Sequence, residues 1–246
     1  MSSSNLVDAA KAGDIESLQR LMSSPDFEWD PDTTAFAAEH GQLEFLKFAF
    51  EHGCPWGTFT CSCAANKGHL DCLQFAHEHG AQLPSYTALD AISNGHLECL
   101  KYACEKGCPV NFLTSWKAAG QSLECLQYLH SIGCPMDMYV SISAARTFRL
   151  DCLRFALEND IPFEHATCVS LSQHTDKIDL DEHIWLRYQL FSLVESGELT
   201  PRDNCKQLYD KVQAKKEEIR LYRQFAMIEC NELPNELINF IVCHYF

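Results

Sequence analysis

The residues with the widest capacity for chemistry in this chain are its 11 histidines and 14 cysteines, because both side chains bind metal ions and a thiolate is a nucleophile. His69 and Cys72 stand three positions apart, as do His96 and Cys99, so the two pairs contain four candidate zinc ligands. The pairs are 27 residues apart in matching segments, and we expect them to point the same way without converging. Structural roles are therefore predicted for all four residues.

Other chemical motifs in the sequence are incomplete. Cys61-x-Cys63 lacks a second cysteine pair at the spacing of a zinc ribbon. The sequence has neither a glycine-rich phosphate-binding loop nor a nucleophile elbow, and a Cys–His–Asp triad would have to combine residues from different repeats. We therefore expect no enzymatic activity, no cofactor and no metal site.

The cysteines recur because a longer segment recurs. Gly68-His-Leu-Asp-Cys-Leu73 reappears as Gly95-His-Leu-Glu-Cys-Leu100, and other copies follow the same pattern. The apolar residue at the third position stands at 15, 43, 70, 97, 123 and 150, in steps of 28, 27, 27, 26 and 27 residues. Such regularity over six copies indicates a repeat protein. Cysteines at matching positions are expected to be small core residues and to remain reduced thiols.

Each repeat is predicted to contain two helices. A pair of small residues marks the first helix, since alanine favours helix and lets neighbouring repeats approach closely. These pairs are Ala9-Ala10, Ala37-Ala38, Ala64-Ala65, Ala91-Ile92, Ala118-Ala119 and Ala144-Ala145. In the second helix, Leu70, Leu73 and Ala76 form a stripe that faces the core. A left-handed glycine is expected to end the second helix, at Gly53, Gly80, Gly107 and Gly133. An N-cap for the next first helix is expected at Thr60, Thr87, Thr114 and Ser141.

These features resemble the ankyrin repeat, whose pattern includes Ala-Ala-x-x-Gly-His-Leu-Glu-x-Leu-Lys-x-Ala and a second helix that ends in glycine. The resemblance covers residues 5–163 and implies an all-α fold, an α-solenoid of stacked helix-turn-helix repeats. The repeats are about 27 residues long, shorter than the usual 33 or so, and they lack the Thr-Pro-Leu-His opening. We therefore expect short loops in place of the protruding hairpins. Short cysteine-bearing repeats of this kind are similar to ankyrin-like families of giant viruses and protists.

A solenoid of this kind offers an extended groove in which variable exposed residues contact a partner. By alignment, the groove is predicted to be lined by residues that flank the paired alanines and differ chemically from repeat to repeat. They are Asp8, Phe36, Glu39, His40, Cys63, Asn66, Lys67, Asp90, Ser93, Asn94, Lys117, Ser143, Arg146 and Thr147. Trp56 and Trp116 are candidate aromatic anchors, because tryptophan is enriched at binding hot spots. The alternatives are that the variable positions are solvated without a role and that both tryptophans pack between repeats.

After residue 163 the period breaks. Residues 164–200 are predicted to be degenerate helices that cap the solenoid, and residues 201–246 to be C-terminal helices. The last segment, 231–246, resembles the first helix of an F-box, and a suppressor-of-cytokine-signalling box ends similarly. That resemblance implies docking on the adaptor of a cullin ubiquitin ligase through Leu233, Pro234, Glu236, Leu237, Ile238 and Ile241. The alternative is an ordinary C-terminal helix that begins with proline.

Charge and hydropathy limit the partners. The formal net charge is −15, which disfavours nucleic acid, and no run of about 20 apolar residues is present to span a membrane. We expect a cytoplasmic protein, in the host cell if its source is viral. The predicted function is a non-catalytic interaction module that binds a partner protein in the groove and recruits it to a cullin ligase. An architectural subunit of a larger complex is the alternative.

Overall fold

The structure, a computed structural model, describes residues 3–163, 165–181, 183–197, 199–200 and 205–229. Within these ranges all regular structure is helical, so the prediction of an all-α fold is confirmed. The chain forms two compact units, with the boundary after Val140. Residues 231–246, which carry the predicted ligase-docking side chains, lie outside the described residues.

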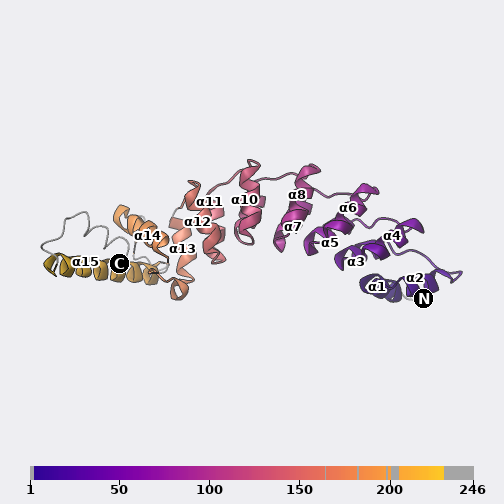
Figure 1. Cartoon of the computed structure of the whole chain (residues 1–246), viewed down its shortest axis with the longest axis horizontal. Coiled ribbons are helices and arrows are strands. Elements are labelled where there is room, and N and C mark those ends of the chain that lie inside the picture. Colours follow the sequence, from indigo (N-terminus) through magenta and orange to yellow (C-terminus); the bar gives the residue numbers. More distant parts are fainter. Residues whose placement is uncertain (1–2, 164, 182, 198, 201–204, 230–246) are drawn as a thin grey trace. The chain divides into compact units, whose positions relative to one another are not determined.

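The first unit contains five successive helix pairs. They are α1 (Ser3–Ala12) with α2 (Ile15–Met22), α3 (Thr33–Glu39) with α4 (Leu43–Glu51), α5 (Thr60–Lys67) with α6 (Leu70–Glu78), α7 (Thr87–Ser93) with α8 (Leu97–Glu105), and α9 (Phe112–Ala119) with α10 (Leu123–Ser131). First helices pack on first helices, from α1 through α3, α5 and α7 to α9, and second helices pack on second helices from α4 to α10. Figure 1 shows the pairs following one another in chain order. This stacking of helix pairs is the architecture of an α-solenoid.

Each repeat of the first unit fills its core with the same few positions. The paired small residues of the first helices are at most 4% exposed, because their short side chains let adjacent helices approach closely. On the second helix, Leu73 and Ala76 are fully buried as predicted, but Leu70 is only half-buried. Cys72, and not Leu70, lies in the core, and Cys72 is completely buried. The same shift applies in the next repeat, where Cys99 and Leu100 are buried. The core stripe therefore begins at the cysteine.

Two kinds of glycine end the helices. Gly80, which follows α6, has φ of +94° as predicted for a left-handed cap, and a Cβ atom there would meet nothing within 4 Å. Gly68, at the end of α5, has φ of +80°, but a Cβ atom there would lie 2.5 Å from Nδ1 of His96 in the next repeat. Gly68 is thus required by its backbone conformation and by a close contact between repeats.

The N-cap prediction is wrong. Thr60 and Thr87 are the first residues of α5 and α7, and both are buried, while Phe59 and Tyr86 hold the N-cap positions without a side-chain hydrogen bond. The Thr60 hydroxyl instead donates to the carbonyl of Gly57 at 2.9 Å. Thr114 is the third residue of α9, where it closes a capping box whose N-cap is Asn111.

Ser141 also fails as an N-cap, because it lies inside α11 (Met138–Arg146) and is buried. The physical reason is the same at each of these positions. Packing of neighbouring first helices takes the small hydroxyl residue into the core, so it cannot stand at the exposed end where a capping side chain is needed.

The second unit includes most of α11, followed by α12 (Leu150–Glu158), α13 (His165–Ser172), a 3₁₀ turn η1 (Thr175–Lys177), α14 (Ile184–Ser196) and α15 (Lys206–Glu229). α15 packs against α13, α14 and η1, and it buries Leu208 and Val212. The positions that hold left-handed glycine in earlier repeats are occupied by Phe148 and Asp160, with φ of 56° and 57°. The capping role of residues 164–200 stays a prediction.

Candidate partner-binding surface

The predicted groove residues of the first unit lie on one set of elements. All belong to the first helices α1, α3, α5, α7 and α9 or directly follow them, and all are exposed or half-buried. We call this set the first-helix face; it consists of Asp8, Phe36, Glu39, His40, Cys63, Asn66, Lys67, Asp90, Ser93, Asn94 and Lys117. Because the first helices pack side by side, the face is continuous from repeat to repeat.

Several residues of the first-helix face contact one another across repeats. Lys67 pairs with Glu39 at 3.6 Å, and the Asn94 side chain donates to the backbone carbonyl of Asn66 at 2.7 Å. At the N-terminal end, Nζ of Lys11 lies 4.9 Å from the centre of the Phe36 ring. Polar groups at neighbouring positions of adjacent repeats therefore form a connected surface, although their chemistry changes along it.

Cys63 is the half-buried thiol of this face. Burial raises its pKa, and the carboxylates of Glu39, Asp90 and Asp32 raise it further. Since only a thiolate is nucleophilic, a raised pKa keeps Cys63 in its unreactive form at neutral pH. Asp90 also accepts a hydrogen bond from the hydroxyl of Ser62. The raised pKa therefore does not favour Cys63 as a nucleophile.

The remaining groove predictions fall in the second unit. Arg146 and Thr147 are exposed, and the Arg146 carbonyl lies 2.9 Å from Nε2 of His174. Ser143 is 3% exposed, so its predicted place in the groove is wrong. It lies on the inward side of α11, where the helix turns this position toward the core.

The two tryptophans predicted as anchors are half-buried. Trp56 donates its indole N–H to the backbone carbonyl of His79 at 2.9 Å, which satisfies an acceptor left unpaired at the end of α6. Its ring stacks on Phe50 with a centroid distance of 5.2 Å and meets Phe75 edge-on at 6.2 Å. These contacts are those of a packing residue between repeats. Trp116 has its ring 6.5 Å from that of Tyr139, and the anchor roles of both stay predictions.

The histidine–cysteine pairs have structural surroundings. Cys72 and Cys99 are buried, and burial raises their pKa values to about 12 and about 11. Their partner histidines lie against the glycine of the preceding repeat, His69 against Gly41 and His96 against Gly68. Among the described residues, no group of three or more His, Cys, Asp or Glu side chains could hold a metal ion.

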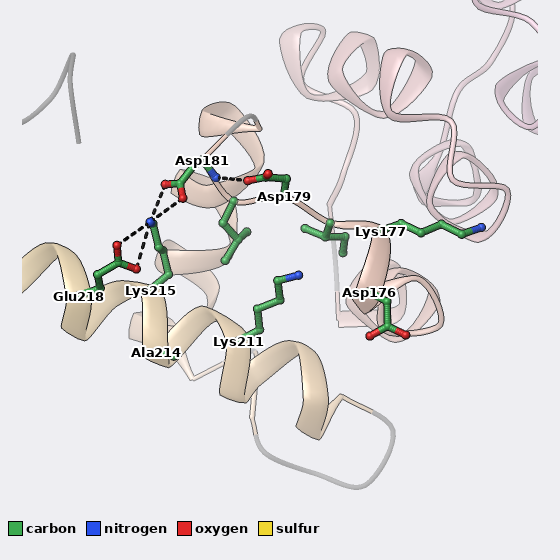
Figure 2. A pocket seen from close by; sticks show the side chains of 10 residues that line it. Asp176, Lys177, Asp179, Asp181, Lys211, Ala214, Lys215 and Glu218 are labelled. Carbon is green, nitrogen blue, oxygen red and sulfur yellow. Dashed lines mark hydrogen bonds and ion pairs between the residues drawn. The ribbon is translucent and has the colours of Figure 1, made fainter.

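A cavity of about 600 Å³ lies in the second unit, between α15 and the segment that joins η1 to α14 (Figure 2). Its lysines are engaged by the protein itself. Lys215 is held between Asp181 at 2.6 Å and Glu218 at 3.1 Å, and Lys211 donates to the Thr175 carbonyl at 2.9 Å. Burial favours a lower pKa for Lys215, but both carboxylates outweigh it and the pKa is raised. The contacts of Lys215 with Asp181 and of Lys211 with Thr175 connect α15 to the segment from η1 to α14, whereas Glu218 lies on α15 itself; we assign the cavity no ligand.

One surface feature of the first unit was not predicted from the sequence: a row of large exposed side chains. Five of the eight large apolar side chains that are exposed in the described part of the chain stand at or beside the start of a first helix. We call Phe59, Tyr86, Phe112, Leu113 and Tyr139 the exposed apolar row. The signal was present in the repeat period, because these residues stand at intervals of about 27.

The fold is that of an ankyrin repeat domain. The chain is similar to the crystal structure of the human ASB11 ankyrin repeat domain, with a TM-score of 0.55 and 18% sequence identity over 64% of this chain and 83% of that chain. No protein-family model matches the sequence, and no curated protein matches it. No helix in the described ranges is long and apolar enough to cross a membrane.

Proposed function

We propose that this chain is a non-catalytic protein-interaction module that holds a partner protein on the first-helix face. One observation carries the proposal: chemically different side chains occupy matching exposed positions over a core that is nearly the same in every repeat. A repeat surface of this kind fits an extended partner contact better than a small-molecule pocket.

The excess of acidic over basic residues in the chain indicates the charge of the partner. With a net charge of −15, the surface attracts basic protein segments and repels phosphate backbones. The 12 cysteines of the described part are all free thiols, which suits a reducing compartment, and we propose a cytoplasmic location.

We also propose that residues 231–246 recruit the bound protein to a cullin ubiquitin ligase. The support is the resemblance of Leu-Pro-x-Glu-Leu, at Leu233–Leu237, to the start of an F-box helix. In this arrangement the repeats select the substrate and the C-terminal segment supplies the ligase contact.

The first-helix face can be tested with a charge swap that keeps its internal ion pair. Glu39→Lys combined with Lys67→Glu inverts two surface charges and preserves their pairing at 3.6 Å. The matched control is Glu98→Lys with Lys101→Glu on α8, a pair at 2.8 Å that lies on a second helix. Circular dichroism checks that both variants fold. We expect proteins captured from lysate by the unaltered chain to be lost with the first swap and retained with the second.

Ligase recruitment is tested by comparing the full chain with a truncation that ends at Glu229. Co-purification of a cullin and its adaptor with the full chain alone would support recruitment. Capture of the same non-ligase partner by both forms would refute it and favour an architectural subunit.

The charge swaps have their own refuting outcome. If neither the Glu39/Lys67 swap nor the Glu98/Lys101 swap affects capture, the first-helix face is not the binding surface.

A further inference from the structure

The exposed apolar row is continuous because the starts of successive first helices lie side by side. Three contacts, between successive first helices or the segments that lead into them, show this. Helix α5 packs directly on α7, Cys108 Sγ before α9 lies 3.5 Å from the Pro84 carbonyl before α7, and Cys134 Sγ before α11 lies 3.4 Å from the Asn111 carbonyl at the start of α9. The row therefore runs across the starts of α5, α7, α9 and α11.

The size of this surface exceeds what scattered apolar residues would give. Its five side chains are between 40% and 53% exposed. Because large side chains of this type present about 150–250 Å² each, the row leaves on the order of 400 Å² of apolar surface in water. Apolar patches of that size on a soluble protein commonly mark a binding site.

The charged side chains of the segments that carry and flank the row are all acidic. Asp32 occupies the matching position at the start of α3, and Asp137 stands two residues before Tyr139. The segments that lead into these helices, residues 26–34, 54–62, 81–89, 108–116 and 134–140, contain no lysine or arginine. A ligand that covers the row would thus meet apolar side chains at its centre and carboxylates at its ends.

The distance between consecutive residues of the exposed apolar row indicates the conformation of the ligand. Packed helices lie about 8–10 Å apart, so we expect consecutive row residues to be separated by about that distance. A polyproline II helix has three residues per turn and a rise of about 3.1 Å, which places every third side chain on one face at steps of about 9 Å. An extended segment with an apolar residue at every third position would meet one row residue with each of them.

We propose that the exposed apolar row binds a polyproline-II-type peptide segment with an apolar residue at every third position and basic residues at its ends. This inference rests on the proposed function, and it names a second surface and the chemistry of the partner. Aromatic rows recognise such segments at little entropic cost, because the polyproline II backbone is already extended before it binds.

The test is fluorescence anisotropy with the full chain and a labelled synthetic peptide, Lys-Arg-Leu-Pro-Pro-Leu-Pro-Pro-Leu-Pro-Pro-Lys-Arg. A control peptide has the same composition with its three leucines adjacent. The variant combines Phe59→Ser with Tyr86→Ser, and serine is a favoured N-cap at both positions, so the helices should be retained. The matched control is Ile132→Ser, which removes a side chain that is 44% exposed outside the row.

We expect the spaced peptide to bind the unaltered chain, and the control peptide to bind at least tenfold more weakly. The double serine variant should bind the spaced peptide about tenfold more weakly, because it removes two aromatic side chains from the proposed contact, and Ile132→Ser should bind normally. Equal binding of both peptides, or equal binding by the double variant, would overturn the proposal.

Other outcomes separate this inference from the proposed function. If no peptide binds while the Glu39/Lys67 swap still abolishes partner capture, the row proposal fails and the first-helix face stands. If the double serine variant instead converts a dimer to a monomer in sedimentation, the row is a contact between two copies of the chain and the peptide proposal fails.

Discussion

The contact between Gly68 and His96 makes a quantitative test of how the repeats are joined. An alanine at Gly68 would keep φ near +80°, which costs an L-residue about 1–2 kcal/mol. Its Cβ would also approach the His96 ring to 2.5 Å, which is 0.9 Å closer than the 3.4 Å at which ordinary contact begins. Displacing the ring by about that amount resembles overpacking, which typically costs about 1–3 kcal/mol. We therefore expect Gly68→Ala to destabilise the protein by about 2–5 kcal/mol.

Gly80 supplies the matched control, since its φ is +94° and no atom would lie within 4 Å of an added Cβ. Gly80→Ala should cost only the backbone strain, about 1–2 kcal/mol. The free energy of unfolding is measured for both variants by urea denaturation followed by far-ultraviolet circular dichroism. Combining Gly68→Ala with His96→Ala should remove the steric part of the cost, measured relative to His96→Ala alone. Equal destabilisation by Gly68→Ala and Gly80→Ala would refute the close approach of adjacent repeats at this point.

Three further predictions concern the core, the thiols and the ion pair between Lys215 of α15 and Asp181. Leu100→Asp should prevent folding, because Leu100 is fully buried and the new charge would have no partner. Leu97 is only half-buried, so Leu97→Asp should give a folded but destabilised protein. Circular dichroism distinguishes the two variants, and a stable Leu100→Asp protein would contradict the assigned core. Burial raises the pKa of Cys61 to about 12, so the thiol should react with Ellman's reagent at pH 8 only after denaturation, and fast labelling of the native protein at this position would refute its burial. The raised pKa of Lys215 means that its contribution to folding stability is complete below its ordinary pKa of 10.5 and is lost as pH rises through the higher folded value. Asp181→Asn should weaken that alkaline loss in pH-dependent urea titrations, and an unchanged profile would argue against the Lys215–Asp181 ion pair.

Repeat architecture is readable from this sequence because it depends on local periodicity. Six copies of one pattern, each with a small-residue helix and an apolar second helix, predict stacked helix pairs without knowledge of any long-range contact. The left-handed glycines are predictable for the same reason, since Gly80 follows directly after its helix and no neighbour is needed to define its conformation.

Other features required the tertiary structure. The sequence gives no sign that Thr60 turns away from the helix end toward Gly57 and the Thr34 hydroxyl, because that choice depends on how closely the two first helices pack. The same holds for Leu70, which the helical period predicts to be a core residue. The packing of adjacent second helices leaves Leu70 half-buried and buries Cys72 fully.

The candidate binding surfaces divide in the same way. The variable residues next to the paired alanines could be named from alignment of the repeats, since their exposure follows from the helical period. Ser143 was the exception, because the turn of α11 places it inward. Phe59 and Tyr86 were missed because large aromatic residues are usually buried, and only the stacked arrangement of helix starts leaves them in water. Local sequence thus determined which helices form and repeat, while packing between repeats decided which side chains those helices expose.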